Sequence, residues 1–243
     1  LESGKDYKDT KKLRYGKVMI MTDQDHDGSH IKGLVLNMFH TMWPSLLKLN
    51  FITSMITPIV KVTKGKKVKS FFNLSDYYDW IEKTSNYKSW KTKYYKGLGT
   101  SNTSEAKEYF KDMKMNNYLW SDLTNESMNL AFNKKQSDLR KDWLYKYNEK
   151  EILDSKEVEI PMDNFINKEL IHFSNSDTKR SIGSLFDGLK PSQRKIIYSC
   201  FKRKLYSEIR VAQLAGYVSE NAAYHHGEAS LQGAIIGMAQ NFV

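Results

Sequence analysis

The stretch that decides the fold lies near the start of the chain, where residues 17–29 read KVMIMTDQDHDGS. Its first part, Lys17 to Met21, is a short apolar run, and this length favours a buried strand over a helix. The polar residues that follow contain three aspartates and end in Gly28-Ser29, a pair typical of a turn between two elements. The stretch therefore predicts a strand that delivers an acidic loop to the start of the next element.

The residues after this loop predict a helix and then a second strand. From Ile31 to Met42 the apolar residues recur at three- and four-residue spacing, which indicates an amphipathic helix, and Pro44 ends or kinks it. Residues 51–62 alternate loosely between apolar and polar side chains and favour one more strand. The order strand, acidic loop, helix, strand is that of a βαβ-like unit, in which functional loops lie at the carboxyl ends of the strands.

The acidic loop is the strongest candidate for a metal site. Asp23, Asp25 and Asp27 alternate along it, so that an extended backbone would project all three carboxylates to one side. Like charges this close repel each other unless a cation lies between them. Oxygen ligands alone favour a hard divalent cation such as Mg²⁺ or Ca²⁺ over zinc. We therefore expect a Mg²⁺ site for phosphoryl chemistry.

Other interpretations of the same loop compete with the Mg²⁺ site. An EF-hand opens with the same pattern but needs a bidentate glutamate six residues after the glycine, and Leu34 occupies that position. The EF-hand is therefore excluded. A phosphatase-type nucleophile at the strand end and an acidic surface loop without a ligand stay open as alternatives.

The charge of the chain points to a polyanionic partner. Its 243 residues include 38 Lys and Arg against 28 Asp and Glu, which gives a net charge of +10. Residues 178–216 contain nine Lys and Arg but only two acidic residues, on segments with helical apolar spacing. Such a patch attracts a polyanion such as duplex DNA. A second basic cluster, 61–69, surrounds Gly65 and is interpreted as a solvated turn.

Composition excludes several other classes of protein. Hydrophobic residues make up 40% of the chain, which is enough for a core and too much for a disordered chain. Cys200 is the only cysteine, which excludes a disulfide framework and a zinc finger and favours a reducing compartment. No apolar run approaches the ~20 residues that span a bilayer, so we expect no membrane partner. Because the chain begins at Leu1 rather than a methionine, we expect a segment of a longer protein.

The remainder of the chain predicts mostly short helices. They are expected at 74–83, 104–115, 131–147, 165–173, 194–201, 211–215 and 231–242, with a strand at 90–95 and a turn at 97–100. Thr103 or Ser104 is expected to cap the second of these helices. The acidic, non-periodic stretch Glu149–Pro161 is expected to separate two domains.

Five motifs of the chain resemble those of type II DNA topoisomerases in their eukaryotic form. In chain order they are Gly16–His30, Tyr94–Ser101, Phe165–Ile171, Asp187–Lys195 and Tyr224–Glu228. The first resembles the TOPRIM metal motif of that family, the second its basic glycine turn, and the last three its winged-helix region. Each motif alone is a weak signal, but five in the family's order, over nearly the whole chain, are a strong one.

The resemblance implies an α/β TOPRIM domain, Rossmann-like with a mostly parallel sheet, followed by a mainly α winged-helix domain. We assign residues 1–150 to a TOPRIM domain that is incomplete at its N-terminus, and residues 160–243 to a winged-helix domain cut before the catalytic tyrosine. That tyrosine, preceded by an arginine, is expected beyond Val243. The family's glutamate ligand is expected upstream, in a Glu-Gly-Asp-Ser motif. No catalytic residue is therefore expected in this chain, which alone should not cleave DNA.

The resemblance also implies a function. It is the breakage-reunion core of an ATP-dependent isomerase, a nuclear homodimer that passes one DNA duplex through another and so relaxes or decatenates DNA. The ATP would be used by a domain absent from this chain. Mg²⁺, with Mn²⁺ or Ca²⁺ as alternatives, is implied on Asp23 and Asp25, and Asp27 is either a supporting ligand or the N-cap of the following helix. A non-catalytic DNA-binding scaffold of the same fold is the alternative function.

The resemblance further places a set of basic and polar side chains against duplex DNA. They are Lys96, Arg140, Lys141, Lys190, Arg194, Lys195, Tyr224, His226 and Ser230. Pro191 is suited to the first turn of a helix, so Lys190 is expected beside a helix N-terminus, where a phosphate binds well. Arg194 offers a bidentate fork to phosphate. Contacts of this kind predict salt-sensitive binding with little sequence preference.

Overall fold

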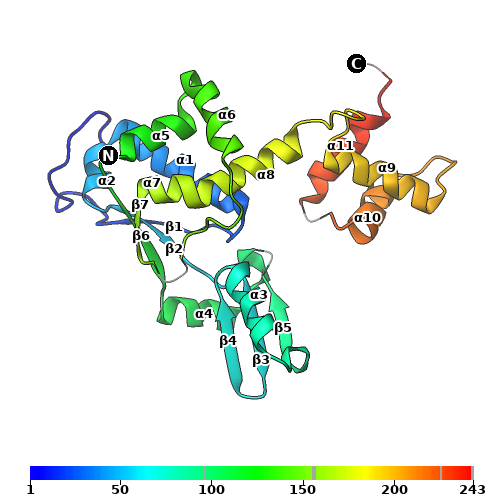
Figure 1. Ribbon diagram of the computed structural model, residues 1–243, viewed down its shortest axis with the longest axis horizontal. Helices are drawn as coiled ribbons and strands as arrows, with labels where there is room; N and C mark the ends of the chain where they lie inside the picture. Colours follow the sequence, from blue (N-terminus) through cyan, green and yellow to red (C-terminus); the bar gives the residue numbers. More distant parts are fainter. Residues whose placement is uncertain (96, 155–156, 225, 242–243) are drawn as a thin grey trace. The chain divides into compact units, whose positions relative to one another are not determined.

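The computed structural model describes residues 1–95, 97–154, 157–224 and 226–241. Its helices and strands are drawn in Figure 1. The chain divides into two compact units, Leu1–Ser174 and Asn175–Val243. The first unit contains helices and strands, whereas the described residues of the second form helices joined by loops.

The first unit is built on a sheet whose described strands follow the order β1-β2-β6-β7. These strands are β1 (Val18–Ile20), β2 (Ile52–Met55), β6 (Met115–Leu119) and β7 (Glu159–Pro161). β1 pairs with β2, and β6 with β7, in parallel, whereas β2 and β6 are antiparallel. Most pairings among these strands are therefore parallel, which confirms the predicted α/β fold. The sequence predicted neither β6 nor β7.

Helices pack on this sheet around one apolar core. They are α1 (His26–Met42), α2 (Pro44–Lys48), α5 (Thr124–Phe132), α6 (Ser137–Tyr145) and α7 (Met162–Phe165). Leu36 and Phe39 of α1 pack with Ile52 of β2, Tyr118 of β6 and Phe165 of α7 in the core. The single helix predicted over 131–147 is wrong, because a short 3₁₀ turn separates α5 from α6.

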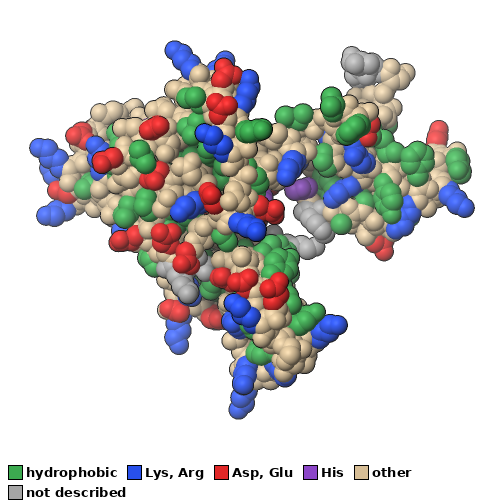
Figure 2. Space-filling model, viewed as in Figure 1, with side chains coloured by type: hydrophobic (Ala, Val, Ile, Leu, Met, Phe, Trp, Pro, Cys, Tyr) green, Lys and Arg blue, Asp and Glu red, His purple; other side chains and the backbone are tan. Residues whose placement is uncertain are grey.

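A separate antiparallel sheet of the first unit has the order β4-β3-β5 among the described residues. Its strands are β3 (Val60–Lys64), β4 (Lys67–Phe71) and β5 (Lys91–Tyr94). In the chain, α3 (Leu74–Lys83) lies between β4 and β5, and α4 (Thr103–Lys111) follows β5. The single strand predicted over 51–62 is therefore wrong, because its two halves, β2 and β3, join different sheets. Figure 2 shows Lys or Arg side chains at the tip of the β3–β4 hairpin.

The basic cluster 61–69 is only partly the solvated turn that the sequence predicted. Gly65 has a φ of +58° in the hairpin turn, which favours glycine there. Lys61, in contrast, is 6% exposed, and its Nζ lies 3.0 Å from Oε2 of Glu108 on α4. Because a buried lysine needs a counter-charge, Lys61 ties β3 to α4 instead of facing solvent.

A continuous helical run ends the first unit. It comprises α7, the π-helical turn η4 (Ile166–Leu170) and α8 (Ile171–Ser181), and the unit boundary at 174/175 falls within α8. The sequence expected a domain boundary within Glu149–Pro161. Ile160, Phe165 and Leu170 are buried in the core of the first compact unit, which extends past that stretch. The expected division into domains of residues 1–150 and 160–243 stays a prediction.

The second unit packs its helices around a small core of its own. These helices are α9 (Pro191–Arg203), α10 (Val211–Asn221) and α11 (Glu228–Ala239). Ile196 of α9, Leu214 and Val218 of α10, and Leu231 and Ile235 of α11 are buried together. The mainly α character that the sequence predicted is present, and the assignment of residues 160–243 to a winged-helix domain stays a prediction.

Candidate functional site

The acidic loop lies between the end of β1 and the start of α1. Asp25 is the N-cap of α1, and its Oδ1 accepts a hydrogen bond from the Gly28 N–H at 2.7 Å. An aspartate in this position satisfies one of the unpaired N–H groups of the first helical turn. Gln24 Nε2 donates to the Met55 carbonyl at 3.1 Å and so ties the loop to the end of β2. The loop is therefore fixed at the edge of the sheet.

The helix begins earlier than the sequence predicted, and this changes the place of Asp27. Because Asp25 caps α1, Asp27 lies inside the first helical turn and is not the N-cap. The sequence predicted an extended backbone that projects all three carboxylates to one side. The backbone is helical after Asp25, so this prediction is wrong for Asp27. A carboxylate in the first turn of a helix is nevertheless favourable, because it faces the positive end of the helix dipole.

The glycine turn after β5 lies against the acidic loop. A Cβ placed on Gly97 would fall 2.6 Å from Asp23 Oδ2, and one placed on Gly28 would fall 2.0 Å from the Asp23 carbonyl oxygen. Gly28 requires glycine because the close atom there is backbone, whereas at Gly97 it is the end of the Asp23 side chain, which could move aside for a small side chain. Lys96, the predicted DNA contact in this turn, lies outside the described residues.

The half-buried carboxylate of Glu105 connects the residues before the glycine turn with those after it. Glu105 of α4 accepts hydrogen bonds from Lys93 Nζ at 2.8 Å, from the Tyr95 hydroxyl, and from the Asn102 N–H at 2.9 Å. Asn102 in turn caps α4, so the predicted caps Thr103 and Ser104 are wrong. Burial alone would raise the pKa of Glu105, but these hydrogen bonds lower it to about 2. Burial and the bond to Glu105 raise the pKa of Tyr95.

No group of three His, Cys, Asp or Glu side chains that could hold a metal ion by itself is present among the described residues. Asp25 is exposed, whereas Asp23 and Asp27 are half-buried. The donor chemistry of these carboxylates suits a hard cation. A ligand from outside the described residues would be needed to complete a three-carboxylate site.

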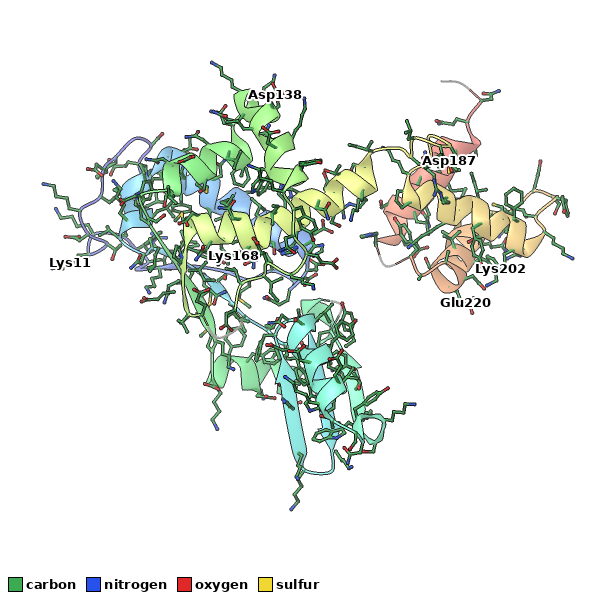
Figure 3. All side chains as sticks on the ribbon, in the orientation of Figure 1. Lys11, Asp138, Lys168, Asp187, Lys202 and Glu220 are labelled. Atoms are coloured by element: carbon green, nitrogen blue, oxygen red, sulfur yellow. The ribbon has the colours of Figure 1, made fainter. Side chains whose placement is uncertain are left out.

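The candidate DNA-binding residues of the second unit gather around the start of α9. Lys190 is the N-cap of α9, Pro191 occupies its first turn, and the Gln193 side chain accepts the Lys190 N–H at 2.8 Å. Arg194 is exposed, but its Nη2 donates to Asp187 Oδ1 and Oδ2 at 2.7 and 2.8 Å. Figure 3 labels Asp187 in the loop between α8 and α9. The guanidinium fork that the sequence predicted for phosphate therefore has a carboxylate partner.

The remaining candidates of the second unit are Lys195 on α9, Tyr224 and His226 in the turn before α11, and Ser230 in the first turn of α11. Lys195 Nζ donates to the Ala223 carbonyl at 2.8 Å and so joins α9 to the turn before α11. In that turn Tyr224 is buried in the core, with its ring 5.5 Å from the ring of His226. His226 and Ser230 are exposed. Tyr224 thus packs in the core, whereas its neighbours face solvent.

A cavity of about 490 Å³ opens beside α9 within the second unit. Lys179, Arg194 and Lys195 supply its cationic lining. Its other lining residues are Ile182, Ser184, Leu189, Pro191, Tyr198 and Ala222. The cavity therefore combines a largely apolar lining with three cationic side chains.

The two candidate DNA contacts on α6, Arg140 and Lys141, both have partners within the first unit. Arg140 Nη1 donates to the carbonyl oxygens of Leu130 and Asn133, at 3.0 and 2.7 Å, and so closes the end of α5. Lys141 is exposed and forms an ion pair with Asp138 at 2.7 Å. The first contact stabilises the fold, whereas an exposed pair one turn apart contributes little.

Sequence reasoning passed over two features of this region. The Asn102-to-Glu105 spacing is a capping-box signal that would have located the Glu105 cluster. The chain also contains one Arg-Tyr pair, Arg14-Tyr15, which precedes β1 in the first unit, and Tyr15 is 68% exposed. This pair lies in the first unit, as the motif Phe165–Ile171 does, whereas the motifs Asp187–Lys195 and Tyr224–Glu228 lie in the second.

Comparison with known proteins places the chain in a family. Residues 55–178 match a family described as the C-terminal associated domain of TOPRIM, and residues 180–243 match the family of the A-type subunit of DNA gyrase/topoisomerase IV. DNA topoisomerase 2-alpha of Homo sapiens is 52% identical over 262 residues, which cover 100% of this chain and 17% of that protein. The chain belongs to the type II DNA topoisomerase family. The resemblance seen in the sequence is thereby confirmed.

Other members of the type II DNA topoisomerase family match equally well. DNA topoisomerase 2 of Plasmodium falciparum is 53% identical over 97% of this chain, and that of Saccharomyces cerevisiae is 52% identical over 100%. The chain spans only 17% and 18% of these two proteins. A crystal structure of the Plasmodium falciparum topoisomerase II DNA-binding, cleavage and re-ligation domain matches with a TM-score of 0.84 and 52% identity, over 100% of this chain and 34% of that one.

Proposed function

We propose that this segment is part of the DNA breakage-reunion core of an ATP-dependent type II DNA topoisomerase. One observation carries the proposal. The whole chain matches, at 52% identity and a TM-score of 0.84, a structure described as a DNA-binding, cleavage and re-ligation domain. ATP use by a domain outside this chain, a homodimeric enzyme and a nuclear location belong to the same proposal. No helix of the described residues is long and apolar enough to cross a bilayer.

The acidic loop is proposed to hold Mg²⁺ through Asp23 and Asp25, with Asp27 in support. When bound, the ion would neutralise charge that develops on the reacting phosphate. Asp25 keeps its carboxylate in place by capping α1, and the carboxylate of Asp23 lies against Gly97. The missing ligand is proposed to be the glutamate of the family's upstream Glu-Gly-Asp-Ser motif.

The start of α9 is proposed to hold the DNA backbone. The N-terminus of this 13-residue helix presents the positive end of its dipole to a phosphate. Lys190 and Arg194 add positive charge at the same place. The Arg194 guanidinium would either replace its bonds to Asp187 with bonds to a phosphate, or donate to both groups at once. His226 and Ser230 would extend the contact along the neighbouring turn.

Duplex binding measured by fluorescence anisotropy tests the DNA interface. Lys190→Glu and Arg194→Glu should weaken binding to every sequence and lower the slope of log affinity against log salt by about 1 each. Lys202→Glu is the matched control, since it makes the same charge change at the other end of α9 and should leave the slope unchanged. Equal losses in all three variants would show that only net charge matters, and the proposed interface would be wrong.

The reacting tyrosine is proposed to come from a part of the family's core outside these residues. The isolated chain should therefore form no covalent adduct with nicked or intact duplex in the presence of Mg²⁺. A denaturing gel with labelled DNA measures this directly, and Tyr15→Phe is the control for the Arg14-Tyr15 pair. An adduct in the wild type that Tyr15→Phe abolishes would overturn this part of the proposal.

A further inference from the structure

The first two turns of α1 pack on the helical run 162–181. The His30 ring stacks on Phe173 with centroids 4.0 Å apart and an angle of 7° between the planes. A Cβ on Gly33 would fall 3.1 Å from Leu170 Cδ1, so the two helices approach closely there. These turns directly follow the acidic loop. Whatever holds them on the helical run therefore also holds the loop.

A buried ion pair lies in the middle of this contact. Lys32 of α1 is only 5% exposed, and its Nζ donates to Glu169 Oε1. Ser29 Oγ donates to the same carboxylate oxygen at 2.7 Å. The charge of a buried lysine needs a partner, because an unpaired charge away from water is strongly destabilising. Glu169 is the acidic partner that the structure gives to Lys32.

The second partner of Ser29 connects this pair to the acidic loop. The Ser29 N–H donates to the Asp25 carbonyl at 3.1 Å, and Ser29 Oγ lies 3.2 Å from the same oxygen. Asp25 also caps the helix through its side chain. Ser29 therefore joins one carboxylate oxygen of Glu169 to the backbone carbonyl of Asp25.

Glu169 belongs to the π-helical turn η4. Such turns are rare, and they occur frequently at functional sites because they change the direction in which side chains leave the helix. Ile166 and Leu170 of the same turn are buried at 0% and 2% exposure. These apolar anchors fix the turn, so that Glu169 meets α1 at a defined place.

We propose that Glu169 is a positioning residue for the acidic loop. By binding Lys32 and Ser29 it holds the first turns of α1 on the helical run, and it thereby sets the direction of the Asp25 carboxylate. The inference rests on the proposed Mg²⁺ site. Groups behind metal ligands that orient them in this way typically change metal affinity 10–100-fold when they are removed.

The test measures binding of Mn²⁺ as a probe by electron paramagnetic resonance, together with thermal stability. Glu169→Gln should weaken Mn²⁺ binding by about 10-fold or more. The double variant Lys32→Met, Glu169→Leu should regain stability, because apolar side chains can replace a buried ion pair without loss, but not Mn²⁺ affinity. Glu108→Gln is the matched control, because Glu108 forms an ion pair with Lys61, which is also buried. The Glu108→Gln variant should bind Mn²⁺ with the affinity of the wild type.

Hydrogen exchange of the Gly28 amide reports the Asp25 cap without any metal. It should accelerate in both Glu169 variants and stay unchanged in Glu108→Gln. A double variant that regains Mn²⁺ affinity together with stability would overturn the inference. So would an exchange rate of the Gly28 amide in the Glu169 variants equal to that of the wild type. A wild-type chain that binds no Mn²⁺ would overturn the proposed metal site instead, and the Gly28 exchange alone would then decide whether Glu169 holds the loop.

Discussion

Glu105→Gln should destabilise the first unit through loss of one charge. The pKa of Glu105 falls from its ordinary value of 4.5 to about 2 because Lys93, Tyr95 and Asn102 donate to its carboxylate. At about 1.4 kcal/mol per pKa unit, this shift corresponds to at most about 3.5 kcal/mol. Lys93 is 39% exposed, so solvent screens part of the attraction and about 1–2 kcal/mol is expected. Glutamine preserves the bond from the Asn102 N–H, which isolates the effect of the charge.

The pH dependence of this loss identifies its cause. Because the folded pKa lies below the unfolded one, the stabilisation is complete above pH 4.5 and is lost as the pH falls towards 2. Thermal unfolding at pH 7 should show a midpoint about 2–8 °C lower for Glu105→Gln than for the wild type. The two proteins should converge near pH 2. Equal midpoints at pH 7, or a gap that persists at low pH, would refute the reasoning.

Three further substitutions test other parts of the structure. Gly28→Ala should destabilise strongly and lower the thermal midpoint, because its Cβ would meet the Asp23 carbonyl oxygen at 2.0 Å, whereas the exposed Gly99→Ala should have little effect. Asn102→Ala should cost about 1 kcal/mol in urea unfolding through loss of the α4 cap, and Asn102→Asp, which can still cap, should recover most of it. Phe165→Ala should cost about 3–5 kcal/mol because the ring is fully buried, and a loss below 1 kcal/mol in the same assay would contradict the described core.

The sequence predicted the elements whose signals are local. The run 17–21 contains β1, and the apolar spacing after Ile31 found the body of α1. Its start was missed because Asp25 acts as the cap and the first helical turn, His26 to Ser29, is polar. The helix over 74–83 was predicted with the bounds that α3 has. In each of these cases a single segment contains the whole signal.

The sequence did not reveal elements that depend on distant partners. β6 reads MNNYL and has little apolar alternation, but it lies between β2 and β7 and so becomes a strand through pairing. The same holds for β7, a stretch that looked like a linker between domains. Glu169 was noticed only as part of a family motif, because its role depends on Lys32, 137 residues away. Local patterns contain no information about such pairs.

The central claim is that the loop holding Asp23 and Asp25 binds Mg²⁺, and a magnesium titration followed by NMR amide shifts tests it most directly. The account predicts saturable shifts of the amides from Thr22 to Ser29 and of Gly97, which lies against Asp23. Asp23→Asn and Asp25→Asn should abolish them, while Asp138→Asn on α6 should not. Shifts that are absent from the loop, or that persist in both loop variants, would contradict the account.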